Sequence, residues 1–216
     1  DTDRTVTLGA TSADITLRNA ANSMAYITSF SNLILALTGG GDFVLTDSNA
    51  LTLTSASTSG NASFTSTNAD LTLSADPAVT GNLSLITTGT GNVIIPTTGI
   101  SQPAGLTISA NDILDTDRSL TLSATNASIT LRDNSAVHSI TSSFSALSLA
   151  LTGAAAFNLT DADALTLSSA SSGGDVNLTA TSADLTVSAD TSVSGTLNLT
   201  TTGTGNVVIP TTGFTQ

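Results

Sequence analysis

Residues 41–59 read GDFVLTDSNALTLTSASTS, residues 60–80 read GNASFTSTNADLTLSADPAVT, and residues 81–99 read GNLSLITTGTGNVIIPTTG. Each stretch opens on Gly and holds two short runs of alternating apolar and polar residues, whose starts lie about nine residues apart. This alternation predicts strands that are buried on one face, and the Gly, Asn, Asp and Ser clusters between the runs predict turns. A unit of about 20 residues cannot bury its own apolar face, so such units must stack on one another.

The whole pattern also repeats at a longer distance. Residues 115–216 align with residues 1–102 at a constant offset of 114, and about 60 of the 102 aligned positions are identical. The segment 103–114, PAGLTISANDIL, lies between them and contains two more strand-like pieces. We therefore divide the chain into repeat copy 1 (1–102), a connecting rung or linker (103–114) and repeat copy 2 (115–216). The 114-residue period then holds six units that average 19 residues.

These repeats predict an all-β chain folded as a parallel β-solenoid, or β-helix, with rungs of about 19–20 residues. Each strand would pair with its counterpart one coil later, and the Leu, Ile and Val side chains would form one continuous core. Eleven or so rungs, spaced about 4.8 Å apart, would make a rod of roughly 50 Å. The alternative is two tandem β-sandwich domains of about 100 residues each. The short internal repeat and the absence of Trp favour the solenoid.

The composition excludes several classes of function. All 16 acidic residues are Asp, the four basic residues are scattered Arg, and the net charge is −12. Four Arg cannot assemble a surface for nucleic acid, so no nucleic-acid partner is expected. No apolar run approaches the roughly 18 residues of a membrane span, so no membrane insertion is expected. The absence of Cys fits a secreted or cell-surface protein of bacterial or viral origin.

The Asn-, Ser- and Thr-rich units, with motifs such as GNLSL, ADLTLSAD and GTGNVII, resemble the β-helical stalks of filamentous haemagglutinins, autotransporter passengers and related adhesins. They are also similar to repetitive phage tail fibres. The resemblance extends over the whole chain. It implies a secreted or surface-exposed structural rod and carries over no catalytic residue.

Three functional hypotheses follow. The leading one is a non-enzymatic segment or subunit of an extracellular rod or filament, which assembles head-to-tail with itself because a solenoid end is an open sheet edge. The second is an adhesin or tail-fibre stalk whose polar face, or divergent segment 135–144, contacts glycan or another surface. An enzyme would need clustered acid, base or cation-binding groups. A chain with no Lys or Glu and one His does not supply them.

Asp-x-Asp pairs are the candidates for a metal site. Their members are Asp1, Asp3, Asp115, Asp117, Asp161 and Asp163. Ca²⁺ prefers such oxygen clusters, but Asp also forms turns by bonding its own backbone. The sequence leaves both roles open, and no other cofactor is expected.

Two other motifs have structural explanations. His138 is the only His, and its counterpart in copy 1 is Met24. We therefore expect a surface or loop residue with no role in binding a transition metal. The motif Gly89-Thr90-Gly91-Asn92, repeated at 203–206, contains GxG, but no helix follows, so we expect a tight turn and no phosphate site.

Thr and Asn residues also form recognisable patterns. Outward Thr would stack into an array of the kind that binds ice in some solenoids, which gives a further, ice-binding hypothesis. In copy 1 this array is uneven, because Arg18, Val44, Ser63 and Ser84 share the outward positions. The composition explains by chance the six Asn-x-Ser/Thr sequons, at Asn61, Asn82, Asn126, Asn158, Asn177 and Asn198.

Overall fold

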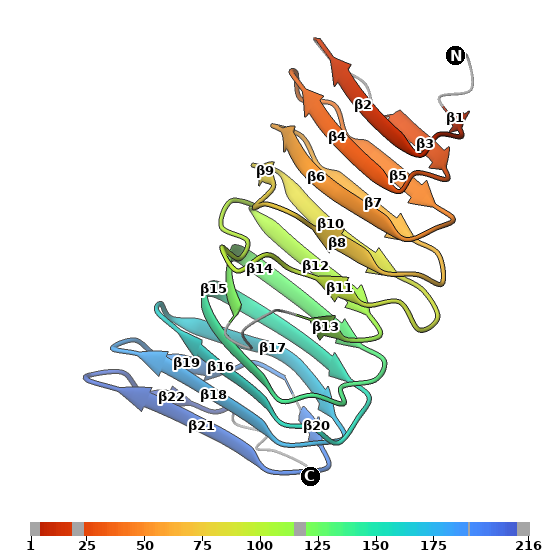
Figure 1. Cartoon of the computed structure of the whole chain (residues 1–216). Coiled ribbons are helices and arrows are strands. Elements are labelled where there is room, and N and C mark those ends of the chain that lie inside the picture. Colours follow the sequence, from red (N-terminus) through yellow and green to blue (C-terminus); the bar gives the residue numbers. More distant parts are fainter. Residues whose placement is uncertain (1–4, 19–23, 115–119, 190, 211–216) are drawn as a thin grey trace.

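The computed structural model describes residues 5–18, 24–114, 120–189 and 191–210. Within these ranges the chain forms 22 strands and no helix. All pairs between these strands are parallel. Figure 1 shows the rungs following one another along a single axis. The predicted parallel β-solenoid is confirmed, and tandem β-sandwiches are excluded because they are built from antiparallel sheets.

The strands stack in columns that run along the axis. The first column consists of β1 (Thr5–Leu8), β3 (Met24–Thr28), β5 (Phe43–Asp47), β7 (Ala62–Ser66), β10 (Asn82–Thr87), β12 (Gly105–Ala110), the second half of β14 (Leu120–Leu131), the second half of β15 (His138–Leu151), the end of β17 (Leu165–Ser172) and β20 (Thr191–Val193). These ten strands correspond to about ten turns.

The other columns flank the first. The second consists of β2 (Ser12–Leu17), β4 (Asn32–Leu37), β6 (Leu51–Thr58), β8 (Leu71–Leu73), β11 (Val93–Ile94) and β13 (Ile113–Leu114), with β9 (Ala78–Val79) also paired to β6. The third consists of the first halves of β14 and β15, then β16 (Phe157–Asp161), β18 (Val176–Thr181) and β21 (Leu197–Thr202). β19 (Leu185–Val187) and β22 (Val207–Val208) stack below the start of β17.

The core is one continuous stack of inward side chains. Successive partners in the first column are Tyr26, Leu45, Phe64, Leu85, Ile108, Ile129, Leu149 and Ala170, all of them buried. Segment 103–114 belongs to this stack, because its strand β12 pairs with β10 on one side and with β14 on the other. The two copies and the rung between them therefore share one core.

The turns of the solenoid contain more residues on average than the 19-residue units that the sequence suggests. Tyr26 pairs with Leu45, 19 residues later, and Leu85 pairs with Ile108, 23 residues later. Six turns from Val6 to Ile129 take 129 − 6 = 123 residues, so the 114-residue period is nine residues short of six turns. Nine residues are one strand-to-strand step, and copy 2 is therefore rotated by one strand about the axis. Equivalent residues of the two copies lie on different sides of the solenoid.

The GTG motif forms the tight turn that the sequence predicts. Gly89 and Gly203 have positive φ values of 58° and 70°. Gly91 lies against the preceding rung, where an added Cβ would be 2.1 Å from the carbonyl oxygen of Ala69. Only Gly permits this approach between two backbones.

Gly91→Ala should lower the free energy of unfolding by about 1–3 kcal/mol, because the new methyl group overlaps a backbone atom that cannot move freely. Gly40→Ala is the matched control, since nothing lies within 4 Å of a Cβ at that position. Urea denaturation of both variants checks this. Equal stability of the two variants would contradict the close stacking of Gly91 on Ala69.

Candidate functional site

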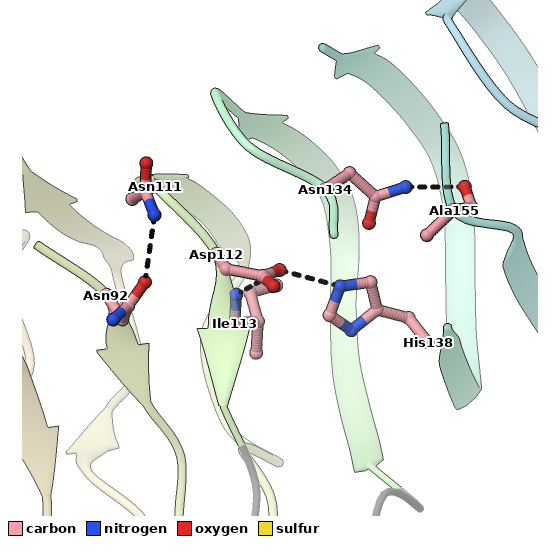
Figure 2. A network of polar contacts seen from close by, with 7 residues as sticks. All are labelled: Asn92, Asn111, Asp112, Ile113, Asn134, His138 and Ala155. Carbon is pink, nitrogen blue, oxygen red and sulfur yellow. Dashed lines mark hydrogen bonds and ion pairs between the residues drawn. The ribbon is translucent and has the colours of Figure 1, made fainter. Parts of the chain in front are cut away.

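The described residues contain one buried pair of titratable side chains, Asp112 and His138. His138 Nε2 lies 2.8 Å from Asp112 Oδ1, and the two side chains are 8% and 5% exposed. Asp112 lies between β12 and β13, and His138 opens β15 (Figure 2). The pair thus connects the rung 103–114 to copy 2.

Backbone contacts fix both partners. Asp112 Oδ1 also accepts a hydrogen bond from the N–H of Ile113, at 2.9 Å. The N–H of His138 donates to the carbonyl of Ala156 at 3.1 Å, and its own carbonyl accepts from Asn158 Nδ2 at 3.0 Å. These backbone contacts hold the Asp112 carboxylate and the His138 imidazole within hydrogen-bond distance of each other.

The surroundings of the pair are mostly apolar. A cavity of about 210 Å³ adjoins His138, lined mainly by Ile113, Leu114, Leu120, Ala136, Val137 and Ile140. The ring of Phe157 lies 6.3 Å from the imidazole, centroid to centroid. A charge is costly to bury in such surroundings unless it is paired and hydrogen-bonded. Each member of the pair therefore depends on the other.

Asn134 adds a further polar group to this region. It is fully buried, and its Nδ2 donates to the carbonyl of Ala155 at 2.7 Å. Its Oδ1 has no hydrogen-bond partner among the described residues. Figure 2 shows this oxygen on the side of the amide that faces the imidazole. An unpaired buried oxygen destabilises the fold.

The expectation that His138 is a surface or loop residue is wrong. His138 is 8% exposed, and its copy 1 counterpart Met24 is also partly buried at the start of a strand. Most of the divergent segment 135–144 lies in β15, so it is not the loop that the sequence suggests. Comparing the two copies does not predict the pair, because Asp112 belongs to segment 103–114, which has no counterpart in either copy.

His138→Met places the copy 1 residue opposite Asp112. This change should lower the free energy of unfolding by about 3–5 kcal/mol, because it leaves a buried carboxylate without a partner. Adding Asp112→Asn should restore part of the loss, since a neutral amide is less costly to bury. Urea denaturation of the four proteins in this double-mutant cycle measures the coupling. Ser139→Ala, on the outward side of β15, is the control; additive effects of the two core changes would contradict the pairing.

A regular row of Thr follows the third column on the outside of copy 2. Its members, each paired in register with the next, are Thr121, Thr141, Thr160, Thr179 and Thr200. The equivalent row in copy 1 is interrupted by Ile27 and Ile86. We call these five residues the Thr row.

A second row lies two residues away on the same strands. Asn177 Nδ2 donates to Asn158 Oδ1 at 2.7 Å, and Asn198 Nδ2 donates to Asn177 Oδ1 at 2.6 Å. Stacked amides of this kind bond along the axis and stiffen the face. No Asp or Arg is outward-facing on these strands. The Thr row and this Asn row lie two residues apart on the same strands, and together they form a face without an outward Asp or Arg on these strands.

The sequence contains a repeated tripeptide that marks this face. Because each copy of it is also an Asn-x-Ser/Thr sequon, composition alone offers an explanation for it. The tripeptide Asn-Leu-Thr occurs at 158–160, 177–179 and 198–200, and the three copies stack directly. The amides of all three Asn are engaged in the Asn row. The tripeptides therefore have a structural explanation better than chance, which is a hydrogen-bonded amide stack.

The predicted metal residues are described only in part. Asp1, Asp3, Asp115 and Asp117 lie outside the described residues. Asp161 is fully buried, and its carboxylate accepts hydrogen bonds from the N–H groups of Phe144 and Asp163, both at 2.8 Å, and from the Ser142 hydroxyl. Asp47 makes the equivalent contacts in copy 1.

This geometry gives Asp161 the turn-forming role, because both of its oxygens are engaged inside the protein. In the described part of the chain, no three His, Cys, Asp or Glu side chains gather as metal ligands would. The Ca²⁺ site stays a prediction. The described part also contains no helix long and apolar enough to cross a membrane.

The chain matches no protein family, no curated protein and no solved structure in comparisons with known proteins.

Proposed function

We propose that this chain is a non-enzymatic structural segment or subunit of an extracellular rod or filament, which extends head-to-tail through its open strand edges. The observation that carries the proposal is the single core that runs through both copies and the rung between them. On the last described rung, Val207, Val208 and Ile209 are 37%, 45% and 49% exposed.

The two copies provide an internal comparison for these residues. Val93 and Ile95, the copy 1 equivalents of Val207 and Ile209, are 0% and 2% exposed. The difference arises because β13 stacks on β11, and the Ile95 N–H donates to Leu114. These equivalent residues are therefore buried where another rung covers them, and exposed where no described rung does. Stacking a further rung would bury this surface.

Other features support a rod. One core runs through both copies without a break, so further rungs would extend it in the same way. The Asn row ends at Asn198, whose Oδ1 accepts no hydrogen bond from the described residues. The net charge of −12 keeps the surface soluble through self-repulsion. The Cys-free composition and the resemblance to adhesin stalks and tail fibres support a place on a bacterial cell surface or a virus particle.

Electron microscopy of the full chain at high concentration should show particles aligned end to end. Their power spectra should contain a layer line at about 4.8 Å along the particle axis, from the spacing of the rungs. Val207→Asp combined with Ile209→Asp should abolish the alignment without unfolding the chain, because both residues are exposed and new carboxylates there repel a stacked rung. Isolated particles at every concentration, indistinguishable from the double variant, would contradict the proposal.

The Thr row favours a second candidate function, the binding of a regular solid surface such as ice. Its hydroxyl groups repeat once per rung, about 4.8 Å apart, on a face without charge. Hydroxyls fixed at equal intervals hold water molecules at equal intervals. A partner with its own lattice would match this face better than a single soluble ligand.

Thr160→Lys should abolish inhibition of ice recrystallisation, since a long charged side chain in the middle of the Thr row breaks its regularity. Thr107→Lys, an outward residue of β12 in the first column, is the matched control and should have no effect. Microscopy of annealed ice checks this. The absence of inhibition by the unchanged protein would rule out this function.

A further inference from the structure

We propose that residues 103–114 form a joining rung between copies of the repeat, and that the Asp112–His138 pair makes this rung specific for the copy that follows it. The inference rests on the proposed function, because it defines how one segment of the rod joins the next. Two independent observations carry it, the burial of equivalent strands and the position of the pair.

The joining rung covers a different edge on each of its sides. On one side β12 pairs with β10, whose Leu83 and Leu85 are fully buried. Their copy 2 equivalents, Leu197 and Leu199 on β21, are only partly buried. On this side the rung completes the C-terminal edge of a copy.

On the other side β12 pairs with the second half of β14. Ile129 and Leu131 in this strand are fully buried. Their copy 1 equivalents, Ile15 and Leu17 on β2, are only partly buried. The same strand therefore completes the N-terminal edge of a copy. In the first column, the C-terminal edge of copy 1 and the N-terminal edge of copy 2 meet through this strand, while Ile100 of copy 1 pairs directly with Leu122 of copy 2 elsewhere.

The rung also carries a buried acid that needs a particular partner. Asp112 bonds to His138, and the equivalent residue of copy 1 is Met24. Of the other described cations, Arg132 donates to the carbonyl of Gly89 and the hydroxyl of Thr87, and Arg18 follows β2 at the N-terminal end of the stack. A joining rung stacked on a copy with Met at this position would bury Asp112 unpaired.

This mismatch discriminates between the two kinds of copy. Specificity arises as much from penalising the wrong partner as from stabilising the right one. The apolar columns of the two copies are similar in character and distinguish the copies weakly, whereas one buried charge distinguishes them strongly. The wild-type rung thus accepts a His-type copy and rejects a Met-type copy, and this sets the order in which copies follow one another.

The test appends a second copy of residues 103–114 after Gln216 of the full chain, so that the new rung can stack on the N-terminal edge of another molecule. Four variants combine Asp or Asn at the position equivalent to Asp112 in the appended rung with Met24 or Met24→His. Sedimentation equilibrium measures their end-to-end association.

The variant with Asp and His should associate about 100-fold more tightly than the variant with Asp and Met. The variant with Asn and Met should also exceed Asp and Met, because it removes the unpaired charge. Equal association of all four would overturn the specificity. Association no tighter than that of the unextended chain would overturn the joining rung, while end-to-end alignment of the unextended chain would still support the proposed function.

Discussion

Each rung of this protein is buried only by the rungs on either side of it. A strand has one apolar face, and its edges are closed by parallel pairing with the strands before and after it in the stack. Val93 and Val207 show the consequence, since the same residue is 0% exposed in the interior of the stack and 37% exposed on the last described rung. The core, the joining rung and the proposed assembly all depend on this constraint.

The 114-residue repeat and the longer six-turn step place equivalent strands of the two copies on different sides of the solenoid. Because 114 residues are nine short of six turns, copy 2 presents its strands on different sides from copy 1. Substitutions between the copies follow this rotation. Thr141 and Thr200 replace Ile27 and Ile86 and complete the Thr row on copy 2. A repeat that looks redundant in sequence can therefore carry one specialised face.

The alternation of apolar residues predicted the solenoid correctly, because period-2 burial and a 20-residue unit leave few alternatives. It did not predict the rotation, since turn residues such as Gly91 show where a turn occurs and not how many residues it uses. The sequence does not predict the burial of His138, because a single titratable residue has no periodicity and its partner Asp112 is 26 residues away in the chain. The Thr pattern of copy 1 does not predict the regular Thr row of copy 2, because Ile27 and Ile86 interrupt the equivalent positions.

The central claim is that both copies and the joining rung form one continuous parallel stack. The chain has no Cys, so spin labels can be attached to pairs of introduced Cys. Val44 and Ser169 are joined by six successive pairings along the first column, and Ser84 and Ser169 by four. Double electron–electron resonance should give separations of about 29 Å and about 19 Å, with the difference set by two rungs. Equal separations for the two pairs, or a broad distribution that ignores the number of rungs, would contradict the continuous stack.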